Sequence, residues 1–374
     1  MTREELGALE IEAPSEEIYR QIRIGWDQAA KPLDGMGRFE ELTARIGAIL
    51  GSVVPDIGKK AVVVMCADNG IVEEGISQSG QEVTGTVAAL MGQGRSSVCR
   101  LAEAAGADVI PVDIGIAGTE KLAGVLDRKI ACGTKNFLKE PAMTETEALE
   151  AIRVGIDMVR SCKEQGYRLI AAGEMGIGNT TTSAAVAAAL TGCAPEEAAG
   201  RGAGLGREGL NRKKQVIAEA LQKYGFVPSD VMQADAVRSE IMRPDALRVL
   251  CCVGGLDIAG LAGVMIGGAV YHIPVVSDGV ITAVAALVAE RLRPGTAAFL
   301  LPSHKSREPV AERVLKELGL HPVIDAQMAL GEGTGAVMMC ELLDLAVKFY
   351  KERTTFSDTR IEPYTRWDTE GSGQ

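Results

Sequence analysis

From residue 60 onward, apolar runs alternate with helical patterns, and a polar or glycine-rich segment closes each run. Short apolar runs rich in β-branched residues are typical of strands that are buried on both faces. We predict six strands, KKAVVVMCA (59–67), ADVIPVDIG (107–115), RLIAAGE (168–174), IPVVSDG (273–279), TAAFLLPSH (296–304) and HPVIDAQ (321–327). Helical patterns between them predict an α/β fold, in which a parallel, Rossmann-like sheet carries helices on both faces.

We predict the main helices over about 80–105, from Asn179, over 280–292, over 307–320 and over about 333–350. Residues 15–51 form two further helical patterns around the turn KPLDGMG, and these helices are expected to lie outside the sheet. The last segment, from Lys351 to Gln374, is polar and aperiodic, which indicates a tail or a loose wrap.

Residues 258–276 are a candidate membrane span, because they contain no Asp, Glu, Lys or Arg over the length that a span needs. Pro274 and glycine pairs interrupt this stretch, and Asp257 and Asp278 flank it without a bias toward Lys or Arg. A buried helix over about 255–270 followed by a short central strand explains the pattern better than a membrane span.

Composition excludes several classes of protein. The net charge is −11 and no Lys/Arg stripe is interleaved with aromatic residues, which argues against a nucleic-acid groove. The first residues lack the apolar core of a secretory signal. The eight cysteines are scattered without a C-x-x-C pair, which is typical of reduced thiols in a cytoplasmic protein and makes a cysteine-bound zinc site improbable.

Polar loops follow the predicted strands, and ligands of open α/β sheets bind at the carboxyl ends of the strands. The loop GEMGIGNTTT places Glu174 at the end of a strand and leaves the backbone N–H groups of Gly176 and Gly178 bare. With Asn179 or a threonine as N-cap, this helix start favours a bound anion. For the threonines alone, a capped helix without a ligand is the favoured explanation, but a carboxylate at the end of a buried strand requires solvent, a partner or a function.

Glu332 lies in a second such loop, GEGTG (331–335), just before a helix whose dipole favours a carboxylate. Taken alone, Glu332 is explained by a solvated glutamate in the first turn of a helix. Two glutamates in matching loops instead suit proton transfer and the stabilisation of a developing sugar cation.

Two further loops carry polar groups. In GRGAGLGREGLNRKK (200–214), Arg201 and Lys213 could neutralise a phosphate, although a surface loop that runs into an amphipathic helix is an equal alternative. The loop PSHKSREP offers Ser306 and His304, and His304 lacks a second histidine at metal-ligand spacing. We therefore predict no metal site.

Familiar nucleotide motifs are missing. The sequence has no P-loop, and the glycine order of GEMGIG differs from the dinucleotide fingerprint, which argues against an NAD-linked oxidoreductase. No predicted strand ends in the paired acidic residues that hold magnesium in diphosphate-dependent phosphoribosyltransferases.

Taken in order, the loops resemble those of one family. KPLDGMGRFEELTARI, ADNGIVEEGISQSGQEVT, GEMGIGNTTTSAAV, GRGAGL, VGGLDIAGLAG, IPVVSDGVI and LGEGTGA together resemble nicotinate-nucleotide–dimethylbenzimidazole phosphoribosyltransferases, over about residues 20–350. The resemblance implies transfer of phosphoribose from nicotinate mononucleotide to a lower-ligand base of cobamides, without a metal or a cofactor. It also implies a homodimer and a large α/β domain (56–330) beside a small helical domain built from residues 1–55 and 331–352, followed by a tail (353–374).

The resemblance also implies roles for individual residues. Glu332 matches the general base, and Glu174 matches a second site glutamate near the ribose or the reacting centre. The substrate-binding residues implied are Met175, Gly176, Asn179, Thr180, Thr181, Gly202, Lys213, Gly279, Ser306 and Leu330.

One loop departs from the family. Many relatives carry an aromatic-proline pair where this chain has Ser79-Gly80, and some carry a glutamine near Ala89. Because that loop lines the base pocket, dimethylbenzimidazole, benzimidazole, adenine and a phenol all remain candidate bases. A nucleotide-binding sensor, or one subunit of a heterodimer with a paralogue, is the alternative to a self-sufficient enzyme.

Overall fold

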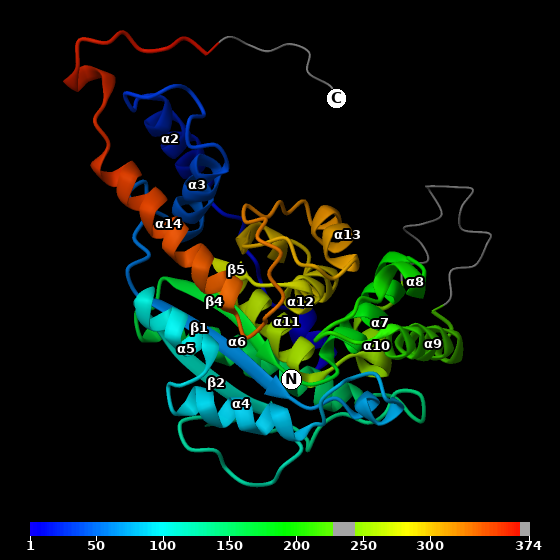
Figure 1. Cartoon of the computed structure of the whole chain (residues 1–374). Helices are drawn as coiled ribbons and strands as arrows, with labels where there is room; N and C mark the ends of the chain where they lie inside the picture. Colours follow the sequence, from blue (N-terminus) through cyan, green and yellow to red (C-terminus); the bar gives the residue numbers. More distant parts are fainter. Residues whose placement is uncertain (227–243, 367–374) are drawn as a thin grey trace.

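The computed structural model describes residues 1–226 and 244–366 of the chain. Six parallel strands pair in the order β3-β2-β1-β4-β5-β6 and form one sheet (Figure 1). The strands are β1 (Lys60–Ala67), β2 (Ala107–Gly115), β3 (Leu126–Asp127), β4 (Leu169–Met175), β5 (Val275–Ser277) and β6 (Leu300–Pro302). This order reverses between β1 and β4, because the chain first builds outward from β1 on one side and then returns to the other side. A reversal of this kind is where doubly wound sheets bind their ligands.

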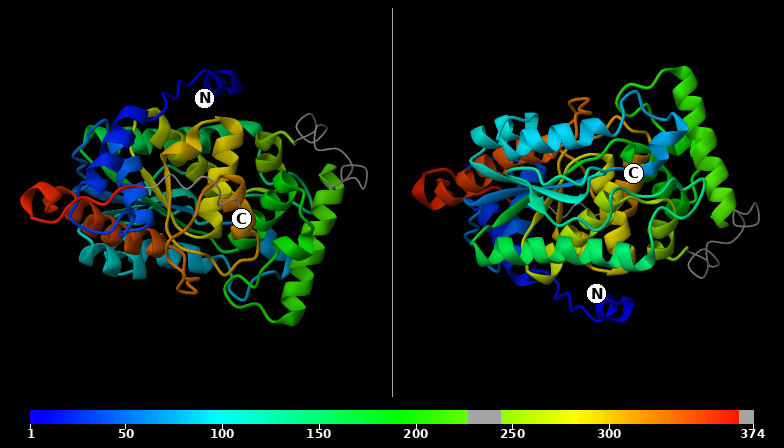
Figure 2. Two further views of the ribbon diagram at one scale, coloured as in Figure 1. Left: turned by 90° about the horizontal axis from the view of Figure 1, so that it is seen from above. Right: turned by 90° about the horizontal axis from the view of Figure 1, so that it is seen from below.

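Helices cover both faces of the sheet, as predicted. Alternate residues of β1 enter different cores, since Val63 and Met65 pack in one apolar cluster while Val62 and Val64 pack in the other. The first cluster holds α6 (Glu145–Glu164), α7 (Asn179–Thr191), α10 (Ala246–Val253), α11 (Leu256–Val270) and α12 (Val280–Leu292). The second holds α3 (Arg38–Leu50), α4 (Glu82–Gly92), α5 (Ser97–Ala104) and α14 (Thr334–Glu352). Figure 2 shows α4 and α5 on one side of the strands and α6 on the other.

The remaining helices lie at the ends of the chain and in the loops. They are α1 (Arg3–Gly7), α2 (Glu16–Asp27), α8 (Pro195–Ala198), α9 (Arg207–Tyr224) and α13 (Val310–Glu317), with 3-10 turns η1 (Gly70–Glu74), η3 (Thr296–Phe299) and η4 (Phe356–Asp358).

Three sequence predictions are corrected. Residues 321–327 do not form a sixth strand, because only one isolated bridge joins Ile324 to His304, whereas the short strand β3 was not anticipated. The helix expected over 80–105 is two helices, α4 and α5, separated at Gly94, which has a left-handed φ of +69°. The strand expected from Thr296 begins only at Leu300, after a 3-10 turn.

The apolar stretch 258–276 divides as predicted into helix and strand. Helix α11 is buried along almost its whole length, and β5 follows it as a central strand. Among the residues that the structure describes, no helix has both the length and the hydropathy of a membrane span.

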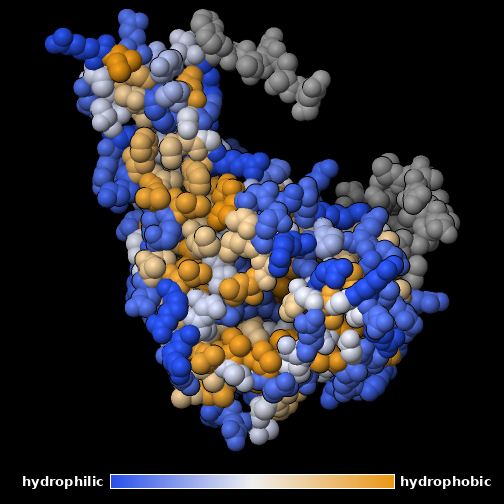
Figure 3. Space-filling model, in the orientation of Figure 1, coloured by the Kyte–Doolittle hydropathy of each residue, from blue (hydrophilic) through white to orange (hydrophobic). Residues whose placement is uncertain are grey.

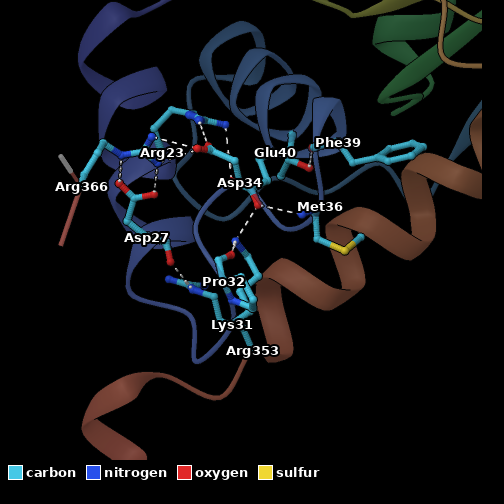
Figure 4. A network of polar contacts seen from close by, with 12 residues as sticks. Arg23, Asp27, Lys31, Pro32, Asp34, Met36, Phe39, Glu40, Arg353 and Arg366 are labelled. Atoms are coloured by element: carbon cyan, nitrogen blue, oxygen red, sulfur yellow. Dashed lines mark hydrogen bonds and ion pairs between the residues drawn. The ribbon is translucent and has the colours of Figure 1, made fainter. Parts of the chain in front are cut away.

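Helices from both chain ends meet around Trp26, which is fully buried. Its indole stacks on Phe349 of α14 at 5.6 Å between ring centroids, and α2, α3 and α14 lie side by side (Figure 1). The segment after α14 follows the same helices. Arg366 binds both Asp27 and Asp34, at 2.7 and 2.9 Å, so this part of the predicted tail is tied to α2 and the turn after it (Figure 4).

Candidate active site

One cavity of about 300 Å³ opens at the carboxyl ends of β4, β5 and β6. It is lined by nearly all the site residues that the sequence predicts: Glu174, Met175, Gly176, Asn179, Thr180, Gly202, Gly279, Ser306, Leu330 and Glu332. Thr181 and Lys213 do not line it. Residues from five separate segments therefore meet at the edge of the sheet where the strand order predicts a site.

Glu174 is the penultimate residue of β4 and is only 7% exposed. Burial raises the pKa of Glu174 to about 8, and the carboxylates of Asp257 and Asp278 contribute to this rise. The side-chain amide of Asn179 donates a hydrogen bond to Glu174 Oε2 and opposes that shift. Glu174 is thus a carboxyl group whose protonated form is favoured until a cation or a donor enters the cavity.

Asn179 has a different role from the one predicted. The N-cap of α7 is Gly178, at φ +94°, and makes no side-chain cap, while Asn179 is the first helical residue. The amide of Asn179 is consequently directed at Glu174 and not at the start of its own helix.

Glu332 stands in a turn of three consecutive left-handed residues. Gly331, Glu332 and Gly333 have φ values of +86°, +61° and +86°. This conformation is strained for a residue with a Cβ, and it costs about 1–2 kcal/mol. Glu332 Oε2 accepts the backbone N–H of Val98, in the first turn of α5, at 3.2 Å. The turn therefore directs the carboxylate at a helix start while it lines the cavity.

Asp278, the residue after β5, holds this turn in place. Its two carboxylate oxygens accept the backbone N–H groups of Gly333, Gly335 and Ala336 at 3.2, 2.8 and 3.1 Å. Burial raises the pKa of Asp278 to about 7, although these same N–H groups favour its ionised form. Asp278 thus caps α14 and fixes the residue that precedes the helix. The sequence signal for this role was the SDG segment, and side chain–backbone pairing across 55 residues could not be predicted from it.

Lys213 of α9 lies behind the cavity wall. Its side chain is fully buried, and Nζ donates a hydrogen bond to Thr180 Oγ1 at 2.9 Å. Burial lowers the pKa of Lys213 to about 8. Lys213 therefore contacts the cavity through Thr180. Thr181 is also fully buried, and its hydroxyl finds no hydrogen-bond partner among the described residues.

The other walls of the cavity are of two kinds. Gly202, Ser306 and Glu308 form one group, which we call the donor end: Glu308 accepts the N–H of Gly202, and Ser306 Oγ accepts the N–H of Glu308. The second group, which we call the apolar wall, consists of lining side chains without polar atoms that form hydrogen bonds: Val83, Val87, Met175, Ile281 and Leu330. The sequence did not predict a role for Val83, Val87 or Glu308, since none of them belongs to a glycine-rich motif.

His304 also lines the cavity, with Nδ1 3.1 Å from Ser303 Oγ and 3.7 Å from Asp278 Oδ1. Burial lowers the pKa of His304 and favours the neutral ring. Among residues 1–226 and 244–366, no three His, Cys, Asp or Glu side chains are grouped as they would be around a metal ion.

Comparison with known proteins places this chain in a family. Residues 11–361 match the family described as Phosphoribosyltransferase. The nicotinate-nucleotide–dimethylbenzimidazole phosphoribosyltransferase of Clostridium acetobutylicum is 41% identical over 347 residues, which cover 93% of this chain and 94% of that protein. The protein of the same name from Acetivibrio thermocellus is 41% identical over 355 residues, covering 93% and 96%.

The fold agrees with the sequence comparison. The crystal structure of CobT from Thermus thermophilus superposes with a TM-score of 0.84 at 38% identity and covers 92% of this chain and 99% of that one. The resemblance found in the loop motifs is therefore confirmed, and the chain belongs to the family of nicotinate-nucleotide–dimethylbenzimidazole phosphoribosyltransferases.

Proposed function

We propose that the protein transfers the 5-phosphoribosyl group of nicotinate mononucleotide to a benzimidazole, releasing nicotinate and an α-riboside 5′-phosphate for cobamide assembly. The observation that carries the proposal is one cavity lined by a glutamate from each of two distant loops, by apolar side chains and by residues with backbone N–H and hydroxyl donors. This combination suits a substrate with a flat apolar base, a reacting sugar and a phosphate.

The phosphate belongs at the donor end of the cavity. Gly202, Ser306 and Thr180, the second residue of α7, line the cavity, and the buried Lys213 donates a hydrogen bond to Thr180 Oγ1. Backbone amides at a helix start and a buried ammonium together favour a phosphate.

The acceptor base belongs against the apolar wall. Val83 and Val87 of α4 stand where the loop departs from many relatives, and Met175 and Leu330 complete the surface. A purine amino group placed there would lose its hydrogen bonds to water, whereas two ring methyl groups would be buried favourably. We therefore propose 5,6-dimethylbenzimidazole as the preferred base, ahead of adenine.

The reaction needs one base and no acid. The bond between C1′ and the pyridinium nitrogen breaks, and its electron pair stays on nitrogen, so that nicotinate leaves without a proton. A ring nitrogen of the azole attacks C1′ from the opposite face and inverts it, while the azole N–H proton passes to Glu332 as general base. Glu174 lies where its carboxylate can face the positive charge that develops on the ribose.

To test this function, purified protein is incubated without added metal with nicotinate mononucleotide and with each of a panel of azoles, phenols and adenine. The products are identified by mass-resolved chromatography. We expect free nicotinate and an α-riboside phosphate, with the highest yield for dimethylbenzimidazole. Nucleotide binding without any product across the panel would instead favour a sensor or a subunit that requires a paralogous partner.

We also propose a cytoplasmic homodimer in which α2, α3 and α14 form the small domain. Helix α14 exposes an apolar stripe of Met338, Leu345 and Phe349 on one face, with the half-buried Leu342 between them, and an orange band lies over this helix in Figure 3. Leu345 is 64% exposed, which is unusual for a leucine that has apolar neighbours on the same face. A second copy of the chain is the occupant that the family resemblance implies. The eight unpaired cysteines support a reducing compartment.

A further inference from the structure

Glu308 occupies the donor end of the cavity with its own carboxylate. It lies in the loop between β6 and α13, and Oε1 accepts the backbone N–H of Gly202 at 2.9 Å. Both carboxylate oxygens also lie close to Gly200, where an added Cβ would come within 2.2 and 2.5 Å of them. The loop at residues 200–202 is therefore shaped around this carboxylate, and a side chain at residue 200 would expel it.

The groups around Glu308 are those that a phosphate requires. Burial lowers the pKa of Lys213, and the negative charge of Glu308 opposes this lowering by attracting the buried ammonium. Lys213 binds Thr180 Oγ1, and that oxygen stands 2.7 Å from where a Cβ on Gly202 would be. On the other side, Ser306 Oγ accepts the backbone N–H of Glu308 at 3.3 Å. In the free protein the Glu308 carboxylate thus accepts the N–H of Gly202 and interacts with the charge of Lys213, while the Ser306 hydroxyl contacts the backbone of Glu308.

A phosphate and this carboxylate cannot share the same donors. Both are anions that accept the N–H of Gly202, and two like charges so close together repel each other. Because Glu308 reaches the cavity from a loop, its side chain can rotate outward without moving the sheet.

We propose that Glu308 is an internal competitor for the phosphate of the nucleotide, occupying the backbone N–H of Gly202 in the free enzyme and returning to it when the product leaves. This inference rests on the proposed function for the identity of the nucleotide. Small anions gain only the donor contacts and must still displace Glu308. Nicotinate mononucleotide also gains contacts to its ribose and ring, so that Glu308 selects for the whole nucleotide over inorganic phosphate and favours product release.

The test is calorimetric titration of inorganic phosphate, and separately of nicotinate mononucleotide, into the wild type and Glu308→Gln. The glutamine has the same shape but no charge, so both ligands should bind about 3- to 30-fold more tightly. Glu308→Ala should give the same direction, which guards against an effect peculiar to glutamine. Glu312→Gln removes one charge from the same segment at a side chain that is 75% exposed, and its affinities should match the wild type.

Each other outcome overturns the inference. Unchanged affinities in Glu308→Gln would mean that the carboxylate only braces the glycine loop, and weaker nucleotide binding would mean that it contacts the substrate directly. Neither titration needs turnover, so the two binding affinities can be interpreted even if the protein catalyses no transferase reaction. If Glu308→Gln binds phosphate more tightly but the protein transfers phosphoribose to no base, the proposed function is contradicted and the role of Glu308 is supported.

Discussion

Glu174 and Glu332 reach the same cavity in different physical states. Glu174 is enclosed at the end of a central strand, where burial and the neighbouring acids Asp257 and Asp278 disfavour its charge. Glu332 is only partly buried and accepts an N–H at the start of α5. Two carboxyl groups with such different surroundings suit different roles, and the more accessible one is the better acceptor for the proton of an incoming base.

Replacing Glu332 with glutamine should therefore remove proton transfer but keep the shape of the site. We expect turnover to fall by about 10²–10⁴, the usual range for a general base, with nearly unchanged nucleotide affinity. Steady-state kinetics and calorimetry measure the two quantities. Glu341→Gln, an exposed change on α14, is the matched control. Near-normal turnover in Glu332→Gln would contradict the assigned role.

The raised pKa of Glu174 also predicts how stability depends on pH. The folded protein retains this proton up to about pH 8, whereas the unfolded chain loses it near the ordinary value of 4.5. The native state therefore binds more protons between these values, and the free energy of unfolding should fall as pH rises through that window. Outside it, this group should contribute no slope.

Denaturant unfolding at several pH values between 5 and 8 checks this, with Glu174→Gln as the comparison. The variant cannot ionise, so its free energy of unfolding should fall less steeply, by at most about 1.4 kcal/mol per pH unit for one group. Asp257 and Asp278, whose pKa values burial raises to about 6 and 7, keep part of the slope in the variant. Identical slopes in both proteins would show that Glu174 is not protonated in the native state.

At the scale of elements, the strained turn 331–333 depends on the start of α14 and on the loop after β5. Asp278 binds three backbone N–H groups there, and Thr334 closes the turn by donating its backbone N–H and its hydroxyl to the carbonyl of Gly331. The position of the proposed base is thus set by a residue from a different strand.

Asp278→Asn should misplace Glu332, because an amide nitrogen would face backbone donors. We expect a loss of about 1–3 kcal/mol in the free energy of unfolding, the usual penalty for unpaired buried donors. Turnover should fall at least tenfold, while nucleotide affinity changes much less. The exposed change Asp325→Asn serves as control. Should nucleotide affinity fall as far as turnover, Asp278 would be a binding residue and not a positioning one.

At the scale of the whole molecule, the exposed stripe of α14 predicts association. Leu345→Glu places a charge in the centre of the stripe and should convert the proposed dimer to a monomer, which sedimentation velocity measures. Lys351→Glu introduces the same residue on the same helix outside the stripe and should leave the dimer intact. A monomeric wild type, or a dimer that persists in Leu345→Glu, would count against this interface.

The sequence by itself determined the order of most strands and helices, the burial of both faces of the sheet and the positions of both glutamates. These features depend on local periodicity and on which residues follow each apolar run, as in β4 and α7. It also determined the family, because the loop motifs that carry the chemistry are contiguous segments.

Only the tertiary structure decided which residues cooperate. The strand expected at 321–327 does not form, because a strand requires a ladder of hydrogen bonds to a neighbouring strand, and His304 and Ile324 make just one bridge. The tertiary structure buried Lys213 behind Thr180, turned Asn179 toward Glu174, and placed Asp278 under the Glu332 turn. Each of these contacts joins different elements of the chain. The depth of a side chain and its partner across the sheet are set by packing, which the local pattern of residues does not contain.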